Sequence, residues 1–458
     1  MYDLTDTIAA IATPLGESGI GVIRISGSKA YDVGDAIFQS TSKVPLKERR
    51  DRSIQYGTIV ADDGRIVDEV LLLIMKGPHS YTAEDVLEIQ CHGGRKPLEE
   101  ILGLVLSHGA RMANPGEFTQ RAFTNGRIDL AQAEAVMDVI QAKSRQGLTN
   151  AVSQLEGRLS QVIGKMRKDL TDFITRLEVT IDYPEEDLED ITVPDVAGAI
   201  KEQLQALDTM LAQSEEGRMI RDGVMVAIAG TPNAGKSSLL NRLLQEERAI
   251  VTDVPGTTRD VLEEWISLKG VPIRLVDTAG IRETEDTVEK IGVHKAKDYI
   301  QKADLVLAVI DASRPLTAED KEILQDVAEK NALIVLNKSD LAAIVSPDDL
   351  AAYGKPVFVI SASTGAGLEA LKEAILQKAL GHSEASGSAL LTNTRHIELV
   401  RQSRAALKRA LDSIEAGMPV DCAVVDLREA WDLLGSITGD TVHDDMVTEI
   451  FSRFCLGK

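Results

Sequence analysis

Aromatic side chains are scarce in this sequence, since only 3% of its 458 residues are Phe, Trp or Tyr. Its hydrophobic cores must therefore rest on Leu, Ile, Val and Ala. Cysteine is scarce as well, and Cys91, Cys422 and Cys455 form neither a C-x-x-C pair nor a zinc-type spacing. This pattern argues against a disulfide framework and is typical of proteins in a reducing cytoplasm.

Long apolar runs are also missing. No run in the sequence approaches the roughly 20 residues that a membrane-spanning helix needs. The first residues lack a basic stretch followed by an apolar one, so we expect no signal peptide. The sequence therefore predicts a cytoplasmic protein without membrane contact.

Positive charge is in deficit, with a formal net charge of −22. Such a chain is not a general binder of polyanions, so any contact with nucleic acid needs a local basic patch. Stretches of this kind are most often solvated helix faces, and nucleic-acid contact is the alternative interpretation. Three such stretches occur: the first basic cluster is Lys47, Arg49, Arg50 and Arg52, the second is Arg158, Lys165, Arg167 and Lys168, and the third is Arg395, Arg401, Arg404, Lys408 and Arg409.

Length and hydrophobic pattern predict a multidomain α/β protein. We expect an α+β domain over residues 1–120, with strands over 20–25, 53–60, 67–75 and 86–91 and a helix over 97–108. Helical spacing recurs over 129–181, 195–216, 396–416, 421–434 and 441–454, although 420–425 also fits a strand. These helices flank residues 219–380. We therefore expect an all-α helical domain (121–218 and 381–458, with 381–387 as a linker) that is interrupted by an inserted domain.

The inserted segment contains a phosphate-binding loop. Residues 230–237 read Gly-Thr-Pro-Asn-Ala-Gly-Lys-Ser, between a strand-like stretch at 224–229 and a helical one at 238–244. In this arrangement backbone N–H groups surround phosphates at a helix N-terminus. Lys236 would reach the β- and γ-phosphates, and Ser237 would hold Mg²⁺.

Three further motifs follow at the ends of expected strands. The motif at 277–280, Asp-Thr-Ala-Gly, places a carboxylate near the metal and a glycine beside the γ-phosphate. The motif at 337–340, Asn-Lys-Ser-Asp, ends in Asp340, which can accept two hydrogen bonds from guanine and none of that kind from adenine. Residues 361–363, Ser-Ala-Ser, suit a backbone contact to guanine O6. Four motifs in this order predict an inserted Ras-like P-loop GTPase domain with a mixed, mostly parallel sheet.

The motifs and the switch stretch between the first two assign a set of residues to GTP. That set is Asn233, Ala234, Gly235, Lys236, Ser237, Ser238, Thr252, Asp253, Val254, Pro255, Gly256, Thr257, Thr258, Asp277, Thr278, Ala279, Gly280, Asn337, Lys338, Asp340, Ser361, Ala362 and Ser363.

Hydrolysis needs a group that orients the attacking water. Ile281 stands where signal-type GTPases often carry Gln after D-x-x-G, and it cannot form hydrogen bonds. Asn233 could instead offer its side-chain oxygen to a monovalent cation, which would supply positive charge near the β/γ bridge. One carboxylate of the acidic stretch 283–289 could orient the water, although most of these carboxylates fit a solvated loop.

Two charged residues of the N-terminal segment are unusual for a core. Arg24 stands inside an apolar strand, and Glu88 lies in another strand just before Cys91. A structural ion pair and a functional site are equally good interpretations of these residues alone.

At this point the sequence resembles one family, the MnmE (also TrmE) tRNA-modification GTPases. The resemblance rests on Gly-x-Pro-Asn-x-Gly-Lys-Ser, Pro-Gly-Thr-Thr-Arg-Asp at 255–260 and Asp-Thr-Ala-Gly, which related GTPases such as Era and Der share. More specific are Gly-x-x-Arg-Ile-Ser at 21–26, Pro-Gly-Glu-Phe-Thr-x-Arg-Ala-Phe at 115–123 and Phe-Cys-Leu-Gly-Lys at 454–458. It covers the whole chain.

The resemblance implies a function. Together with the flavoprotein MnmG, which would hold FAD and NADH, the protein would add an aminomethyl or carboxymethylaminomethyl group to C5 of the wobble uridine of certain tRNAs. The one-carbon unit would come from 5-formyl- or 5,10-methylene-tetrahydrofolate in the N-terminal domain. The resemblance places folate contacts at Arg24, Glu88, Arg127 and Lys458.

It also implies the metals and the assembly. K⁺ would lie at Asn233, Thr252, Val254 and Thr257, and Mg²⁺ at Ser237 and Thr258. Glu289 would position the attacking water. A homodimer would form through the N-terminal domain, the two GTPase domains would meet when GTP binds, and MnmG would complete a heterotetramer. Cys455 is more often the kind of residue that fills a core, yet its place near the folate allows a chemical role.

Two alternatives remain at this stage. One is a GTP-switched ribosome-assembly or RNA-binding factor like Era or Der, which would be expected to carry a basic RNA-binding module after the GTPase domain. The other is a dimerising scaffold with a vestigial GTPase, against which the intact nucleotide motifs argue.

Overall fold

The computed structural model describes residues 6–182, 193–247, 263–277, 299–380 and 391–458. The chain forms two compact units, one of residues 1–137, 160–168 and 431–458 and the other of residues 138–159 and 169–430. Within the described ranges, every helix is too short or too polar to span a membrane. The domain boundaries predicted at 120, 218 and 380 stay predictions.

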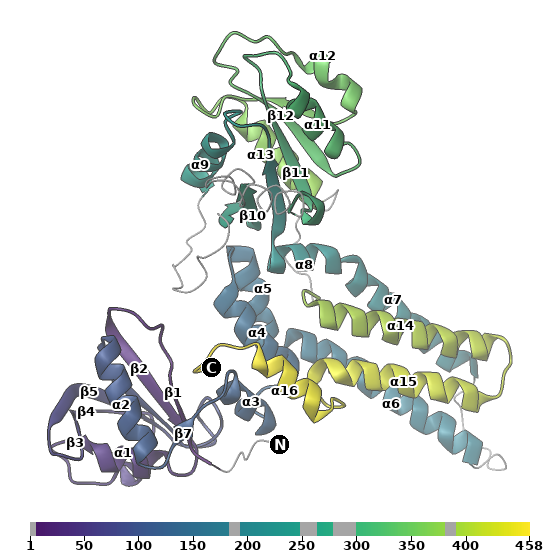
Figure 1. Cartoon of the computed structure of the whole chain (residues 1–458). Helices are drawn as coiled ribbons and strands as arrows, with labels where there is room; N and C mark the ends of the chain where they lie inside the picture. Colours follow the sequence, from purple (N-terminus) through teal and green to yellow (C-terminus); the bar gives the residue numbers. More distant parts are fainter. Residues whose placement is uncertain (1–5, 183–192, 248–262, 278–298, 381–390) are drawn as a thin grey trace. The chain divides into compact units, whose positions relative to one another are not determined.

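A seven-stranded sheet organises the first unit (Figure 1). Its strand order is β3-β4-β5-β6-β2-β1-β7, and every neighbouring pair is antiparallel except β1 and β7. The four strands predicted from alternation, within β2, β4, β5 and β6, are confirmed. The strands are β1 (Ile8–Ile11), β2 (Ser18–Ser26), β3 (Phe38–Gln39), β4 (Ser53–Val60), β5 (Ile66–Met75), β6 (Val86–Gly93) and β7 (Arg111–Met112).

The two faces of this sheet differ because side chains alternate along a strand. Ile23, Ile25, Leu87 and Ile89 face helices α1 (Ala30–Ile37) and α2 (Arg95–Ser107), and together they form one core. Both helices lie on this face (Figure 1). The intervening residues of β2 and β6 point the other way. Alternation thus puts Arg24, the odd residue of an apolar strand, on the face that α1 and α2 leave open.

Further helices complete the first unit. Phe118 of α3 (Glu117–Thr124) packs on the opposite face of β1, against Ile8 and Ala10. Helix α16 (Asp444–Ser452) carries Phe451, whose ring centroid lies 6.2 Å from the ring centroid of Phe123. A 3₁₀ turn, η1 (Leu46–Glu48), carries part of the first basic cluster.

A six-stranded sheet lies in the second unit, in the order β13-β12-β11-β8-β10-β9. Only β9 and β10 pair antiparallel, and the other four pairs are parallel. The mixed, mostly parallel sheet is therefore confirmed. Its strands are β8 (Val224–Ala229), β9 (Glu263–Leu268), β10 (Val271–Asp277), β11 (Leu305–Asp311), β12 (Ala332–Asn337) and β13 (Val357–Val359).

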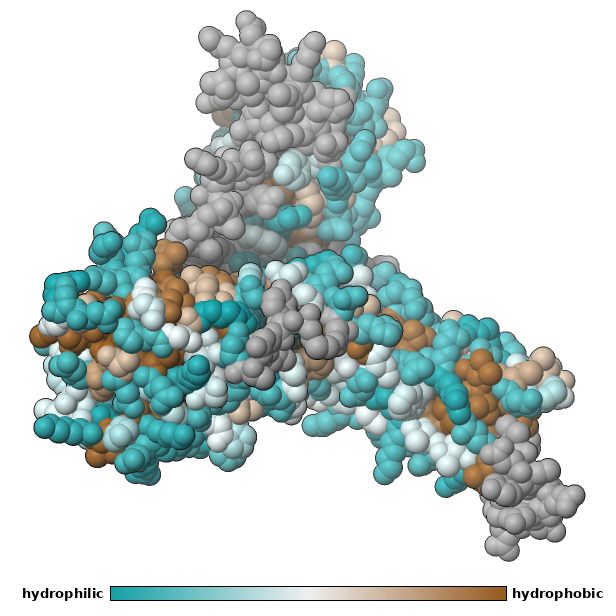
Figure 2. Space-filling view, turned by 60° about the horizontal axis from the view of Figure 1, so that its bottom comes forward, coloured by the Kyte–Doolittle hydropathy of each residue, from teal (hydrophilic) through white to brown (hydrophobic). Residues whose placement is uncertain are grey.

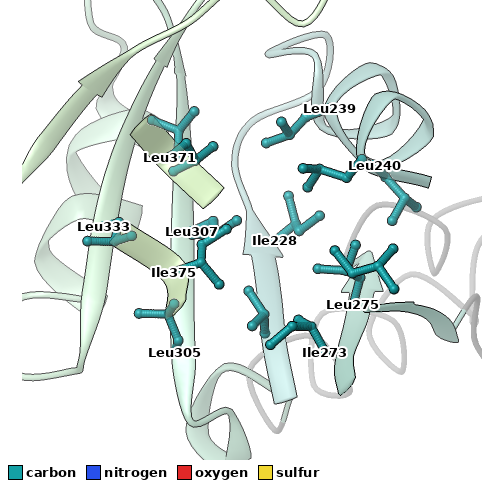
Figure 3. Close-up of a cluster of buried hydrophobic side chains, with 14 of the residues drawn as sticks. Ile228, Leu239, Leu240, Ile273, Leu275, Leu305, Leu307, Leu333, Leu371 and Ile375 are labelled. Carbon is teal, nitrogen blue, oxygen red and sulfur yellow. The ribbon is translucent and has the colours of Figure 1, made fainter. Parts of the chain in front are cut away.

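Aliphatic side chains fill the space beside this sheet (Figure 3). Leu239 and Leu240 come from α9 (Lys236–Glu247), and Leu371 and Ile375 from α13 (Leu368–Leu380). They meet Ile228 and its neighbours on the strands, and all are buried. The other face carries α11 (Ala318–Asp326) and α12 (Pro347–Leu350), with a 3₁₀ turn, η2 (Ala351–Tyr353), after α12. A core of Leu, Ile, Val and Ala is what an aromatic-poor chain requires.

The helices on either side of the inserted segment in the sequence differ in detail from those predicted. The stretch 129–181 is not one helix but three, because Ser144 caps a new one through a bond from the Gly147 N–H and Gly157 has a positive φ of 85°. The stretch 195–216 is also divided, after Ala212. Residues 420–425 belong to a helix. The bounds are α4 (Leu130–Gln141), α5 (Arg145–Leu155), α6 (Arg158–Asp182), α7 (Val193–Ala212), α8 (Ser214–Asp222), α14 (Thr394–Glu415) and α15 (Val420–Thr438).

Candidate functional site

The phosphate loop joins β8 to α9, as the motif predicts. Asn233 has φ of 63° and Gly235 has φ of 92°. At Gly235 a Cβ atom would come within 2.2 Å of Asn337 Nδ2, so this turn admits only glycine. Asn233, Ser237 and Ser238 are exposed, whereas Ala234 is buried.

Lys236 is held inside the loop. Its side chain is buried, and its Nζ donates a hydrogen bond of 2.8 Å to the Thr231 carbonyl oxygen. The ammonium group is thus fixed by the loop's own backbone at the first turn of α9. A lysine in this place supplies a positive charge to the terminal phosphates.

Asn337 links the phosphate loop to the guanine motifs. Its Nδ2 donates to the Ala234 carbonyl oxygen at 3.0 Å, and its Oδ1 accepts from the Ala362 N–H at 3.0 Å. Lys338 has φ of 67°, and its Nζ lies 2.6 Å from Asp311 Oδ2. Backbone strain of this kind persists where the surroundings hold it, and it is frequent at functional sites.

Asp340 is exposed at the end of this motif, with its carboxylate oriented by serine. The Ser361 hydroxyl donates to Asp340 Oδ1 at 2.6 Å and lies 2.9 Å from the Ser363 hydroxyl. This hydrogen bond holds the pKa of Asp340 below its usual value. An ionised carboxylate that keeps a free direction suits the paired N–H groups of guanine.

Part of the predicted GTP site lies outside the described residues. This applies to Thr252, Asp253, Val254, Pro255, Gly256, Thr257, Thr258, Thr278, Ala279, Gly280 and Glu289. Asp277 ends β10, whose partner β8 leads into the phosphate loop. Among the residues that the structure describes, it brings together the phosphate loop, Asn337, Lys338, Asp340 and residues 361–363.

A second cluster of charged residues lies on the open face of the first unit's sheet. Arg24 and Glu88 are direct neighbours across β2 and β6, and Arg24 Nε lies 2.8 Å from Glu88 Oε1. Arg24 also donates to the Gly457 carbonyl oxygen at 3.3 Å, which ties residues 454–458 to this face.

Tyr81, which sequence reasoning missed, is the centre of this cluster. Its ring centroid lies 5.0 Å from the Arg24 guanidinium carbon, 4.8 Å from that of Arg127 and 5.9 Å from Lys458 Nζ. Its hydroxyl lies 2.9 Å from the Thr119 hydroxyl. Three of the four residues that the resemblance connects to folate thus gather around one aromatic ring, and the fourth, Glu88, joins them through its ion pair with Arg24. We call these five residues the Tyr81 cluster.

The Tyr81 cluster has an excess of cations. Burial lowers the pKa of Lys458, the charge of Arg24 lowers it further, and Glu88 partly offsets both effects. Holding several cations together, partly removed from water, raises the free energy of this site. An anionic ligand would lower it. Cys455 is exposed, and its carbonyl oxygen accepts from the Gly116 N–H at 3.3 Å.

The motif at 115–123 builds a buried ion network beside this cluster. Arg121 is completely buried and lies 2.5 Å from Asp6 Oδ1 and 3.1 Å from Glu117 Oε1. It also lies 3.2 Å from Glu84, in the segment that follows Tyr81. Burial opposes ionisation of Glu117, but hydrogen bonds from Arg111 and the Asn114 backbone outweigh it and lower its pKa. This motif supports the Tyr81 cluster rather than forming part of it.

The third basic cluster is largely neutralised by carboxylates. Arg404 pairs with Asp208, and Lys408 Nζ lies 2.7 Å from Asp412. Arg409 lies 2.8 Å from Asp426 and 2.5 Å from Glu429. The pair that joins α14 to α7 lies where the two helices run side by side (Figure 1). These contacts favour the solvated-face interpretation for this cluster.

Comparisons with known proteins cover the chain almost completely. The family model of the MnmE helical domain matches residues 130–455, and that of the GTP-binding protein TrmE N-terminus matches residues 7–127. The chain belongs to the MnmE family of tRNA modification GTPases. The resemblance stated from the motifs is thus confirmed, and with it the three-part fold and a GTPase, an enzyme that hydrolyses GTP.

Individual relatives agree. The tRNA modification GTPase MnmE of Alkaliphilus metalliredigens is 48% identical over 459 residues, covering 99% of this chain and all of that protein. Its counterpart in Heliobacterium modesticaldum is 49% identical over 463 residues, covering 99% of each. Both matches extend far beyond the nucleotide motifs, which favours this family over the Era or Der alternative.

A solved structure also matches in part. Era from Aquifex aeolicus, bound to GDP and aluminium fluoride, is 29% identical and covers 40% of this chain and 66% of its own, with a TM-score of 0.28. A score this low supports no conclusion about the fold.

Proposed function

We propose that this GTPase acts on tRNA and, together with MnmG, adds an aminomethyl or carboxymethylaminomethyl group to C5 of the wobble uridine. The one-carbon unit comes from a tetrahydrofolate bound at the Tyr81 cluster, and the nitrogen comes from ammonia for the aminomethyl group or from glycine for the carboxymethylaminomethyl group. FAD and NADH belong to MnmG, and the reaction takes place in the cytoplasm. The observation that carries the folate part is the convergence of three cations on the Tyr81 ring.

The chemistry of the Tyr81 cluster fits a folate. A pterin ring is planar and presents adjacent N–H donors, and the glutamate tail of a folate carries carboxylates. The Glu88 carboxylate can accept from the pterin edge, because Arg24 contacts only its Oε1. Arg127 is exposed and Lys458 is half-buried, so both can meet carboxylates at the rim. Tyr81 offers an aromatic face.

The metals belong to the other site. Ser237, at the start of α9, fits Mg²⁺ because its hydroxyl is a hard oxygen ligand beside the phosphate loop. Asn233 is exposed, and its amide oxygen can serve K⁺, which would add positive charge near the transferred phosphate. The assignments of Thr252, Val254 and Thr257 to K⁺, of Thr258 to Mg²⁺ and of Glu289 to water positioning stay sequence-based.

A homodimer through the first unit is part of the proposal. Ile54, Tyr56 and Leu71 are 62%, 67% and 42% exposed on the open face of the sheet. Tyr56 and Leu71 are paired across β4 and β5, so the three side chains form one apolar surface. Hydrophobic residues reach the surface of this unit (Figure 2). An exposed apolar patch of this kind commonly marks an interface, here with a second copy.

Calorimetric titration with 5-formyltetrahydrofolate tests the folate site. The wild type is compared with Tyr81→Leu and Lys458→Ala, and Arg404→Ala serves as the control in the neutralised third cluster. Loss of a charged contact should weaken folate binding about tenfold or more in Lys458→Ala. GDP affinity should stay unchanged in all variants.

Two results would count against this assignment. One is a wild type that binds GDP but no folate. The other is equal folate affinity in the wild type, Tyr81→Leu and Lys458→Ala. Reduced affinity in Arg404→Ala as well would mean that general charge, not the Tyr81 cluster, attracts the ligand.

A further inference from the structure

Asp320 is a buried carboxylate at the start of α11 with more partners than a helix cap needs. Its exposed fraction is 0%. Thr317 caps the helix, because its hydroxyl accepts from the Asp320 N–H at 3.2 Å. Its own N–H and hydroxyl donate to Asp320 Oδ2, at 2.9 and 2.8 Å. Two further residues bind the same carboxylate: Arg314 at 2.7 and 3.1 Å, and Thr231 of the phosphate loop at 2.9 Å. These last two contacts extend beyond α11.

Thr231 connects this carboxylate to the loop lysine. Its hydroxyl donates to Asp320 Oδ1 and accepts from Arg314 Nη2 at 2.8 Å, so it is held from two sides. Its carbonyl oxygen accepts from Lys236 Nζ at 2.8 Å and from the Ala234 N–H at 3.3 Å. The buried residue Thr231 thus binds Asp320 and Arg314 through its hydroxyl and holds Lys236 through its carbonyl oxygen.

The same arginine lies beside the guanine motif. Arg314 Nε is 4.0 Å from Asp311 Oδ2, and that carboxylate pairs with Lys338 Nζ at 2.6 Å. Asp311 ends β11 and also accepts from the Ser313 N–H and hydroxyl. Charges of alternating sign therefore run from Asp320 through Arg314 and Asp311 to Lys338.

We propose that Arg314 and Asp320 are positioning residues, which hold the phosphate loop in its nucleotide-binding shape through the Thr231 hydroxyl. Neither residue needs to touch the nucleotide. The loop carries several backbone N–H groups that must point at the phosphates together, and a loop fixed beforehand loses less freedom on binding. The proposal goes beyond GTP hydrolysis itself and does not depend on the folate site.

The test removes the Thr231 hydroxyl and keeps the shape of the side chain. Thr231→Val is nearly isosteric, Thr231→Ser restores the hydroxyl, and Arg314→Met removes the charged partner at a site that is 31% exposed. Thr317→Val is the matched control, because it removes the α11 cap and one hydrogen bond to Asp320 Oδ2 but keeps the contacts of Asp320 with Thr231 and Arg314. Calorimetry gives GDP affinity in Mg²⁺, and thermal unfolding gives stability.

We expect GDP affinity to fall about tenfold in Thr231→Val and in Arg314→Met, as for the loss of one well-placed hydrogen bond. Thr231→Ser should bind within about twofold of the wild type. The double variant Thr231→Val/Arg314→Met should bind GDP no more weakly than either single variant, because both substitutions act through the same Thr231 hydroxyl. Thr317→Val should unfold at a lower temperature and bind GDP normally.

Wild-type GDP affinity in folded Arg314→Met and Thr231→Val would overturn the proposal. So would a loss in Thr317→Val as large as theirs, because the network would then act only through the general stability of the domain. If Thr231→Val does not fold, Arg314→Met alone decides between these outcomes.

Discussion

Replacing Arg121 by Met should destabilise the first unit strongly. The guanidinium is completely buried among Asp6, Glu84 and Glu117. Met keeps much of the volume but none of the charge. Glu117, itself 1% exposed, would keep only Arg111, at 2.6 Å, as a charged partner.

The magnitude follows from burial. Removing one partner of a buried ion pair costs about 3–5 kcal/mol, because the other charge stays in a poorly hydrated place. Arg65→Met is the control, since Arg65 and its partner Glu100 are 55% and 31% exposed. A pair that exposed should contribute less than about 1 kcal/mol.

The pH dependence has a definite sign. Burial raises the pKa of Asp6 and of Glu117, but hydrogen bonds to arginine outweigh it, so both folded-state values lie below the ordinary ones. The network therefore stabilises the fold fully above the ordinary carboxyl pKa of about 4 and loses this contribution as pH falls below it. The difference between wild type and Arg121→Met should shrink in acid.

Urea unfolding can be followed within the first unit. The chain has two tryptophans, and Trp431 belongs to this unit whereas Trp265 does not. Fluorescence in a Trp265→Phe background therefore reports on the first unit. The reasoning would be refuted if Arg121→Met lowered the free energy of unfolding by less than about 1 kcal/mol, or by no more than Arg65→Met does. Because Glu84 follows Tyr81, folate affinity should fall too.

Four further predictions concern the GTP site and the basic clusters. Hydrolysis should be fast in K⁺ and slow in Na⁺, and Asn233→Ala should remove the difference; equal wild-type rates in both salts would contradict the K⁺ assignment. Asp340→Asn should have a lower affinity for GTP and a higher affinity for xanthosine triphosphate, because the 2-oxo group of xanthine can accept a hydrogen bond from the new amide. Competition binding measures both affinities. Joint replacement of Arg404 and Arg409 by Ala should leave tRNA binding in a filter assay within about twofold, because carboxylates already neutralise them. Burial raises the pKa of Asp320, but hydrogen bonds from Arg314 and Thr317 outweigh it and lower the pKa to about 2. Acid unfolding of the wild type and of Asp320→Asn should therefore show a stability difference that is complete above about pH 4 and shrinks between about pH 4 and 2.

A GTP site could be proposed from the sequence because the motifs that would form it are contiguous. The phosphate loop needs Gly235 and Lys236 at a fixed spacing, and the guanine motif needs Asp340 three residues after Asn337. Each piece stands at the end of a strand, where a parallel sheet gathers its functional residues. The structure places these pieces next to one another accordingly.

The Tyr81 cluster was only half predictable. Alternation along β2 explains why Arg24 is not a core residue, but the partner strand that brings Glu88 opposite it depends on sheet order. Tyr81 lies in a loop and carries no motif. The one signal it gave was an aromatic side chain in a chain with few of them. Its surroundings come from residues as distant as Arg127 and Lys458.

Ion pairs between residues far apart in the chain could not be predicted from the sequence either. Arg404 and Asp208 are 196 residues apart, so a basic run that looks like a nucleic-acid surface can be neutral in the fold. The network of Arg314 and Asp320 is a similar case, since a capping box at Thr317 predicts only the local contact. Residues 129–181 form three helices because Ser144 caps a new helix and Gly157 forms a turn. Hydrophobic periodicity alone does not predict either feature.

The most direct test of the proposed function follows the carbon. The purified protein is incubated with MnmG, FAD, NADH, tRNA, GTP, Mg²⁺ and K⁺. Ammonium or glycine supplies the amine, 5,10-methylenetetrahydrofolate carries a label at the methylene carbon, and the nucleosides are analysed by mass spectrometry. We predict the labelled carbon in the C5 substituent of the wobble uridine, and little of it with Tyr81→Leu. Hydrolysis of GTP with an unlabelled wobble uridine would contradict the proposed role of the folate site.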